Sequence, residues 1–570
     1  MNKRQVLIAI LVVFAIAVPF LNKPYHIDDT VVLIVSQKIL DNPFDPFQGV
    51  INWFGYNAPV WEITTNPPFL SYYLAPFAAV SDFSEIALHA AMMLFLFLLA
   101  GAMFFLSRRF TKGSLFPLLF VMFSPAIMIS GNVMRDVPAT GLAAAAVALF
   151  IYGTDREDRR YLFLGAVFAG LATLTKYSSI IFLPVLLLYP FFKQKYRLMI
   201  WIWPIPVIMG LWCLHNQLMY GQIHIVDLTL NRRDESGLSW QDKVCGAFVI
   251  FSSMIYLLPA LLRDLYKRRD MFLIESKYFI ALAAWWFVQS YFKGKADGEY
   301  LFWAITGAVF LFIILIDGLR RGIAYVTNRR DEEAADSLFL FAWLCAPIIF
   351  SIVLVPFQAV RHQLNSLLPL MLLAFRYLER EPRPAIHAQK IWLVVLIVIQ
   401  AAMAYVLHFA DYEYAKTYRD FAQDAKQKWV SEDHDTWYVS HWGWQFYADR
   451  AGFKQVNGGE VYPQEGDILF WPKFNLPMYV FIGRDGILEP RAEFLELEKH
   501  TPLEEIVYPG TIPIRVMNFR GACFYATVHN NLPYRFFQDI ELETMRVYRV
   551  EFEKSDDPAS TEAVEPPNQE

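Results

Sequence analysis

Long apolar segments follow one another closely along the first 410 residues, and they restrict this chain to a helical membrane protein. The 570 residues are 56% hydrophobic and only 18% charged, which is less charge than a soluble enzyme of this length carries. A helix needs about 20 apolar residues to cross a bilayer, and several segments are shorter, so their true bounds differ by a few residues. The sequence predicts roughly thirteen membrane helices, at residues 5–20, 84–106, 115–129, 137–152, 161–174, 178–192, 198–218, 244–262, 278–291, 300–316, 338–356, 364–378 and 391–409.

Charge and cysteine usage narrow the classes of function. The net charge is -5 and no basic stripe occurs, so we expect no nucleic-acid partner. The four cysteines are scattered and show neither a metal-binding spacing nor a disulfide framework. His215, Asn216, His224 and Asp227 offer metal-ligand chemistry, but their spacing matches no fixed site, and we favour a solvated loop. A divalent metal ion stays open as a cofactor.

Basic residues gather in every alternate loop between the apolar segments. Because such loops face the cytoplasm, the pattern predicts a cytoplasmic N-terminus and an external C-terminus. The first segment contains Ala15-Ile16-Ala17, which resembles a signal-peptide cleavage site, but we favour a retained anchor. The basic loop residues begin with Lys3 and Arg4 and continue with Arg108, Arg109, Lys112, Arg156, Arg159, Arg160, Lys193, Lys195, Arg197, Arg263, Lys267, Arg268, Arg269, Arg320, Arg321, Arg329, Arg330, Arg380 and Arg383.

Two neighbouring acids, Asp28 and Asp29, stand in the first external loop, residues 21–67. Ionised groups at a membrane boundary are expensive and usually mark function. A pair of carboxylates also suits general-base or metal-assisted chemistry. The alternative is a hydrated loop that carries two acids. The loop ends in Asn66-Pro67-Pro68, before a short apolar segment at 69–80 that predicts a helix lying along the interface.

Other ionisable residues fall in external turns, and each has a structural alternative. Asp136, after Arg135, is either a site residue or the N-cap of the fourth membrane helix. Lys176 lies at the turn of a tight apolar hairpin, where the alternative is a lysine that reaches the interface. Arg361 and His362 lie in a later turn, where the alternative is interfacial anchoring.

Taken together, these acids and bases share one membrane face. A carboxylate beside fixed cations suits a reaction with an anionic leaving group, because the acid activates a nucleophile and the cations stabilise developing phosphate charge. A phosphate on a long lipid tail fits a site bounded by lipid. The set comprises Asp28, Asp29, Asp136, Arg135, Lys176 and Arg361.

The chain resembles the C-type glycosyltransferase superfamily, in particular the bacterial branch similar to protein O-mannosyltransferases and the aminoarabinose transferase of lipid A. The order and spacing of the motifs carry the resemblance, which covers about residues 6–409. The matching pieces are Asp28-Asp29, Asn66-Pro67-Pro68-Phe69-Leu70, Arg135-Asp136-Val137-Pro138-Ala139, residues 170–176, residues 212–221 with Asn216, and residues 361–369.

The resemblance implies a sugar donor linked to polyprenyl phosphate and transfer to a lipid, glycan or protein acceptor with inversion. It makes Asp28 the base and puts Asp29 in the position of the second acid. It makes Asp136 a further acidic site residue, and it implies that Lys176 and Arg361 bind the lipid phosphate. It also implies that the membrane is a bacterial inner membrane. Three departures leave the sugar, the acceptor and any metal open. Asn66 stands where close aminoarabinose-transferase relatives carry Lys, Asp29 where Glu is frequent, and Arg361-His362 where Arg-Tyr is usual.

Composition changes after about residue 411. Strands are predicted at 436–442, 467–471, 478–483 and 522–529, with a helix at 443–450, which indicates a small external α/β domain over 411–552 beyond a membrane domain over 1–410. Asp449, Asp467 and Arg520 form no recognisable catalytic set, so acceptor recognition or a structural cap is the favoured role. The acidic tail 553–570 is predicted to be disordered.

Two rival functions remain. A transporter or flippase for lipid-linked glycans also needs many helices, but it favours ionisable residues at the bilayer midplane and internal repeats, and neither is seen. A polymerase or ligase that joins lipid-linked glycans shares the donor type and uses a different acceptor.

Overall fold

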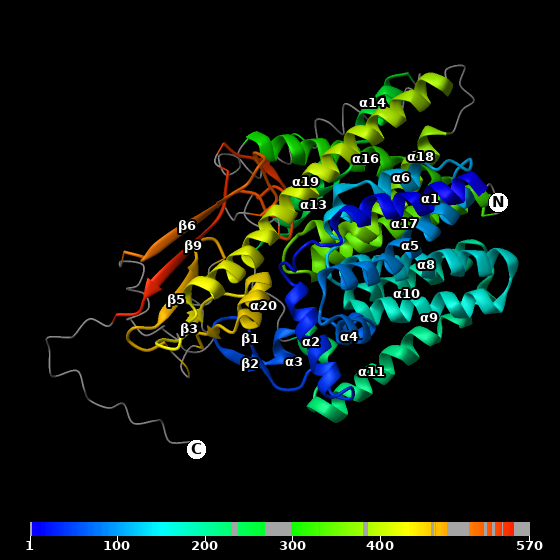
Figure 1. The fold of residues 1–570 in the computed structure, drawn as a ribbon. Coiled ribbons are helices and arrows are strands. Elements are labelled where there is room, and N and C mark those ends of the chain that lie inside the picture. The colour runs from blue at the N-terminus through cyan, green and yellow to red at the C-terminus, as the bar shows by residue number, and fades with distance from the viewer. Residues whose placement is uncertain are drawn as a thin grey trace.

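The chain folds into a helical bundle with a small β-sheet at one end, beside the long helix α19 (Ile386–Trp429) (Figure 1). The computed structural model describes residues 3–230, 238–267, 285, 298–329, 331–379, 386–457, 461, 463–475, 501–517, 521–526, 531–538 and 540–551. The predicted membrane helix at 278–291 (residue 285 apart), the predicted strand at 478–483 and the predicted disordered tail lie outside these residues.

Seven stretches of helix in the described part are long and apolar enough to cross a membrane. This confirms a mostly helical, polytopic chain, whereas the predicted number of thirteen spans is not confirmed. The stretches are Lys3–Phe20 (α1, Lys3–Ala17, with η1, Val18–Phe20), Glu85–Phe110 (α5), Asp136–Arg156 (α8), Tyr196–Tyr220 (η3, Tyr196–Ile202, with α11, Pro204–Tyr220), Gly298–Thr327 (α16), Glu332–Leu354 (α17) and Lys390–Trp429 in α19.

Several other predicted segments form shorter helices. The segment at 115–129 is two helices, because the Ser124 side chain caps the second by accepting from Ile127 N, and Pro125 has no N–H to continue the first. The segment at 244–262 is likewise interrupted between Met254 and Leu258. The shorter helices are α6 (Phe116–Met122), α7 (Pro125–Ile129), α9 (Arg159–Thr175), η2 (Tyr177–Ile181), α10 (Phe182–Phe192), α12 (His224–Leu230), α13 (Trp240–Met254), α14 (Leu258–Lys267), η4 (Val360–Gln363) and α18 (Leu364–Leu378).

The first predicted loop contains regular structure of its own. It holds α2 (Asp29–Asp41), a hairpin of β1 (Val50–Asn52) and β2 (Asn57–Pro59), and α3 (Val60–Ile63). The apolar segment that follows forms α4 (Phe69–Ser81), close to its predicted bounds. The hairpin joins the C-terminal region, because Asn52 Nδ2 donates to Val456 O at 2.8 Å.

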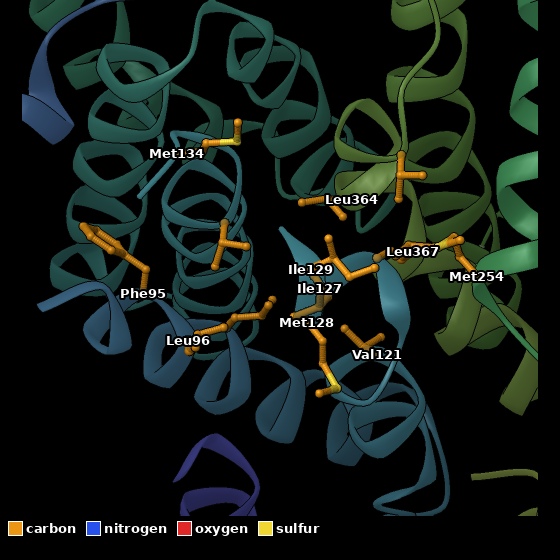
Figure 2. Close-up of a cluster of buried hydrophobic side chains, with 14 of the residues drawn as sticks. Phe95, Leu96, Val121, Ile127, Met128, Ile129, Met134, Met254, Leu364 and Leu367 are labelled. Atoms are coloured by element: carbon orange, nitrogen blue, oxygen red, sulfur yellow. The ribbon is translucent and has the colours of Figure 1, made fainter. Parts of the chain in front are cut away.

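Helix α8 is the centre of the bundle. In the most apolar part of α8, 89% of the residues are buried, compared with 17% in the stretch formed by η3 and α11. Small residues let its neighbours approach closely, since a Cβ at Gly141 would lie 2.4 Å from the carbonyl oxygen of Phe95 in α5. Figure 2 shows the adjoining core, where side chains of α5, α7 and α18 converge: Phe95, Leu96, Ile127, Met128, Ile129, Leu364 and Leu367.

The described residues of the C-terminal region build a five-stranded sheet in the order β4-β3-β5-β9-β6. Helix α19 extends through the predicted domain boundary at 410–411 and packs on α20 and β9. The strand predicted at 522–529 is wrong in its described part, where only isolated bridges occur at Ala522 and Cys523. The elements are β3 (Thr436–Tyr438), α20 (Trp442–Ala451), β4 (Lys454–Gln455), β5 (Ile468–Pro472), β6 (Glu504–Pro509) and β9 (Glu541–Arg549), with a separate pair, β7 (Ile514–Arg515) and β8 (Arg535–Phe536).

Candidate functional site

The two neighbouring acids of the first loop face different surroundings. The side chain of Asp28 is 36% exposed, whereas Asp29 is fully buried. The residue before them, Ile27, has φ +49°, a left-handed conformation that is a strained choice for a β-branched side chain. Since α2 begins at Asp29, this turn sends the first acid outward and the second into the protein.

Asp28 is paired with Arg361. Arg361 Nη1 donates to Asp28 Oδ2 at 2.6 Å. Burial by itself would lower the pKa of Arg361, but Asp28 and Asp136 outweigh burial and raise that pKa, so the guanidinium stays charged. Arg361 lies in η4, whose first residue, Val360, donates its backbone N–H to Phe524 O of the C-terminal region at 3.4 Å.

Asp136 is paired with Lys176. Lys176 Nζ donates to Asp136 Oδ1 at 2.5 Å, and both side chains are largely buried. Asp136 is the first residue of α8 and not its N-cap, which is Arg135. Lys176 joins α9 to η2 and is only 17% exposed, so it does not extend freely to the interface. The alternatives considered from the sequence, an N-cap for Asp136 and an interfacial lysine for Lys176, therefore do not describe these two side chains.

Arg135 and His362 complete what we call the charged cluster. Arg135 is buried, and its Nε and Nη2 atoms have no hydrogen-bond partner among the described residues. Burial lowers the pKa of Arg135 to about 10, so it remains a cation near neutral pH. Burial and the nearby cations Lys176 and Arg361 lower the pKa of His362 well below its usual value, which keeps the imidazole neutral. The cluster consists of Asp28, Arg135, Asp136, Lys176, Arg361 and His362.

Asn66 holds the end of the first loop against this cluster. Its Oδ1 accepts the backbone N–H of Tyr177 at 3.3 Å, one residue after Lys176, and its Nδ2 donates to Thr65 Oγ1 at 3.0 Å. Asn66 is therefore placed beside the Lys176 turn, where it bonds a backbone N–H and a hydroxyl group.

A buried polar network next to Asp29 was not predicted from the sequence. Lys23 Nζ donates to Asn132 Oδ1 at 2.6 Å and forms an ion pair with Asp411. Tyr525 OH donates to the same carboxylate of Asp411 at 2.7 Å. An acid within a long apolar helix is a signal for such a network, and Asp411 in α19 carries it. The network ties the first loop to α19 and to the C-terminal region.

Asp29 lies next to this network. Its Oδ2 accepts the backbone N–H of His26 at 2.8 Å, and its Oδ1 has no partner in the described part of the chain. Burial raises the pKa of Asp29 well above its usual range, so the buried acid favours the protonated form. A fully buried carboxyl cannot be reached by an acceptor hydroxyl, and this separates Asp29 from the partly exposed Asp28.

A strained turn of the C-terminal region lies near Asp28. Ser440 and Trp442 have φ values of +89° and +62°, and His441 between them is buried with neither ring nitrogen bonded to a described residue. Burial lowers the pKa of His441 to about 4, with Asp28 near enough to oppose the shift. Thr30 Oγ1 donates to Trp442 O at 2.7 Å. The sequence offered no signal for this contact.

The residues considered as metal ligands, which are His215, Asn216, His224 and Asp227, do not form a metal site. His215 is hydrogen-bonded to Phe44 O at 2.8 Å and His224 to Thr64 O at 2.9 Å. Within the described residues no group of three or more His, Cys, Asp or Glu side chains is arranged to hold a metal ion.

Comparison with solved structures finds proteins of low identity. An oligosaccharyltransferase from Archaeoglobus fulgidus, tethered to an acceptor peptide, is 12% identical with a TM-score of 0.48, over 89% of this chain and 69% of that one. The oligosaccharyltransferase AglB from the same organism, in complex with an inhibitory peptide and a dolichol-phosphate, is 12% identical with a TM-score of 0.46, over 80% and 64%. ArnT from Cupriavidus metallidurans, bound to undecaprenyl phosphate, is 13% identical with a TM-score of 0.41, over 96% and 97%.

Comparison with curated protein sequences finds no match. Residues 65–217 match the model of the dolichyl-phosphate-mannose-protein mannosyltransferase family. The matched segment includes Asn66, Arg135, Asp136 and Lys176 and ends before Arg361. Over these residues the chain is similar to that family of glycosyltransferases, and the match confirms the resemblance predicted from the sequence.

Proposed function

We propose that this chain is an integral membrane glycosyltransferase. It moves a sugar from a polyprenyl-phosphate donor to a lipid, glycan or protein acceptor on the external face of the membrane, with inversion. The observation that carries the proposal is the charged cluster, in which three cations surround two acids at one end of the central helix α8. The excess of positive charge favours an anionic ligand, and the half-exposed Asp28 supplies a base beside it.

The cluster supports a direct displacement. An acceptor hydroxyl attacks the anomeric carbon while Asp28 takes its proton, and the bond from that carbon to the phosphate oxygen breaks. The bonding electrons leave with the polyprenyl phosphate, whose added charge is stabilised by Lys176, Arg361 and Arg135. Attack from the face opposite the phosphate inverts the anomeric configuration.

The family match supports the donor class. Dolichyl-phosphate-mannose is a sugar on a long isoprenoid phosphate, and three of the cluster's charged residues lie inside the matched segment. The pattern of basic loops supports an external site, since Asp28 follows the first membrane segment and Lys3 and Arg4 precede it. We extend the proposal to thirteen spans, a bacterial inner membrane and an external C-terminal domain that helps to bind the acceptor.

The test is sugar transfer by purified protein in lipid nanodiscs, with defined polyprenyl-phosphate sugars and acceptors chosen by mass spectrometry of envelope glycans from cells with and without the protein. Asp28→Asn is nearly isosteric and should retain donor binding while transfer slows by about two to four orders of magnitude. Asp29→Asn should slow transfer less, because Asp29 is buried and favours its protonated form.

Three results would change the proposal. Near wild-type transfer by Asp28→Asn with loss in Asp29→Asn would exchange the roles of the two acids. Transfer unaffected by either substitution would refute the mechanism. Movement of an intact lipid-linked glycan across the bilayer, with no sugar transferred, would establish the rival flippase function.

A further inference from the structure

An open groove lies between α1, α5 and α8, away from the charged cluster. It encloses a volume of about 730 Å³, within the range of sites that hold small ligands. Its walls are apolar, with Ala9 from α1, Phe97 and Phe105 from α5, and Tyr152 from α8. Gly101 contributes no side chain, and a Cβ built there meets no atom within 4 Å, so the groove stays open at its middle.

The length of the groove matches one leaflet of a bilayer. Its lining on α5 runs from Phe97 to Arg109, which at 1.5 Å per residue is roughly 18 Å. Half of a hydrocarbon core that is about 30 Å thick is roughly 15 Å. An acyl chain that entered the groove would therefore reach from the headgroup level to the bilayer centre.

One end of the groove is basic. Arg108, Arg109 and Arg156 line it, and Arg109 is already paired with Asp155 and Asp336 at 2.6 and 2.8 Å. Arg108 and Arg156 have no carboxylate partner among the described residues. Arg108 donates to Gln5 Oε1 at 2.9 Å, and Arg156 lies over the ring of Tyr152 at 5.3 Å. Two guanidinium groups thus remain available for an anion at the mouth of an apolar groove.

This basic end is remote from the candidate transfer site. Asp136 begins the 21-residue helix α8 and Arg156 ends it, so the two residues are about 30 Å apart along the helix axis. The positive-inside pattern puts Arg108 and Arg156 on the cytoplasmic side. A ligand in the groove therefore belongs to the leaflet opposite the charged cluster.

We propose that the groove binds one anionic phospholipid of the cytoplasmic leaflet. An acyl chain lies against Phe97, Gly101 and Phe105, and the phosphate lies between Arg108 and Arg156. Charge complementarity selects an anionic headgroup, because a zwitterionic lipid brings its own cation to a mouth that is already positive. The bound lipid joins α1 to α5 and α8, and α1 leads through η1 to Lys23 and the loop of Asp28.

The test uses the full chain, purified and exchanged into detergent with phosphatidylglycerol, phosphatidylcholine or a polyprenyl phosphate. Lipid retention is read out by native mass spectrometry, and stability by thermal unfolding. Wild-type protein should retain one phosphatidylglycerol and be stabilised by it, with little response to phosphatidylcholine. Arg108→Gln with Arg156→Gln should weaken phosphatidylglycerol retention by about tenfold or more, as expected on losing charge-assisted contacts. Arg159→Gln with Arg160→Gln removes the same charge from the same side outside the groove and should change nothing.

A second variant tests the apolar part. Gly101→Leu places a side chain in the groove, where the Cβ meets no atom within 4 Å, so it should abolish lipid retention without lowering the unfolding temperature in lipid-free detergent. Equal retention of phosphatidylglycerol by wild type and both groove variants would overturn the proposal. So would equal retention of the two phospholipids by wild type, or preferential retention of polyprenyl phosphate over phosphatidylglycerol. None of these readouts depends on sugar transfer.

Discussion

Arg361 and Asp28, 333 positions apart in the chain, form an ion pair of 2.6 Å at the centre of the charged cluster. In this arrangement the cation neutralises the acid that we propose as the base. A donor phosphate is a competing anion for Arg361, so we expect donor binding to draw the guanidinium toward the phosphate and to free the carboxylate. The pair then links donor binding to activation of the acceptor.

The first prediction concerns Arg361. Arg361→Met should weaken donor binding by about ten- to a hundredfold, because a charge-assisted contact to phosphate is lost. Asp28 is 36% exposed, so water can solvate the carboxylate left behind and the fold should persist. Donor binding and thermal unfolding measure the two effects, with Arg159→Met as the matched control. Unchanged donor affinity would exclude a phosphate role for Arg361.

Lys176 allows a separate test of the phosphate contact. Lys176→Met leaves Asp136 buried without its 2.5 Å partner, so it should lower both stability and donor binding. Asp136→Asn with Lys176→Met removes both charges and should recover stability but not donor binding. Lys176→Arg should retain partial donor binding, because charge remains on a larger planar group. Full donor binding in the double variant would show that the pair is only structural.

Gly443 tests the contact between the C-terminal region and the loop of Asp28. A Cβ at Gly443 would lie 2.1 Å from the carbonyl oxygen of Tyr25, so Gly443→Ala must displace backbone three residues before Asp28. We expect a loss of about 1–3 kcal/mol in stability, typical of overpacking, together with slower transfer. Gly210→Ala is the control, since its Cβ meets nothing within 4 Å. Wild-type unfolding temperature and transfer in Gly443→Ala would contradict this contact.

Glu543 of β9 should make stability depend on pH. Burial raises the pKa of Glu543 from 4.5 to about 7. Between these values the folded state binds more protons than the unfolded state, so the free energy of unfolding falls as pH rises, by up to about 3 kcal/mol. The loss of stability is absent below the pKa of Glu543 in the unfolded state and complete above its pKa in the folded state.

The comparison of Glu543→Gln with wild type at pH 5 and pH 8 measures this effect. Gln can still accept from Phe474 N and Thr544 N and can donate to Tyr418 OH, and it loses only the acceptor of Asn475 N, so the variant should fold with a lower stability at both pH values. Its unfolding temperature should fall less between the two pH values than that of wild type. Glu505→Gln, at an exposed position of β6, should behave as wild type. The same pH response in wild type and Glu543→Gln would refute the assignment.

The last prediction concerns topology. A periplasmic reporter fused after Val550 should be active, whereas the same reporter fused after Thr327, at the end of α16, should be inactive. The reason is the concentration of Arg320, Arg321 and Arg329 around that second position. The opposite pair of results would place Asp28 on the cytoplasmic side and remove the basis for an external transfer site.

The sequence by itself determined the class of the protein and the motifs that matter. Apolar length alone predicted membrane helices near α5, α8, α16 and α17, because a bilayer demands that length whatever the fold. It did not predict the break at Pro125, where the structure divides the predicted segment 115–129 into α6 and α7 because proline cannot donate to the preceding turn. The resemblance rested on local motifs, and the family match over residues 65–217 includes those at 66–70, 135–139 and 170–176 but neither Asp28-Asp29 nor residues 361–369.

Only the tertiary structure decided which charges meet. Asp28 and Asp29 are adjacent and chemically alike, and they differ because one strained turn at Ile27 exposes the first and buries the second. Lys23 and Asp411 are separated by 388 positions, and no local pattern predicts that they pair. Membrane insertion depends on the summed hydropathy of one segment, so the sequence could predict it. Ion pairing and burial depend on distances between elements remote in sequence, so only the tertiary structure could decide them.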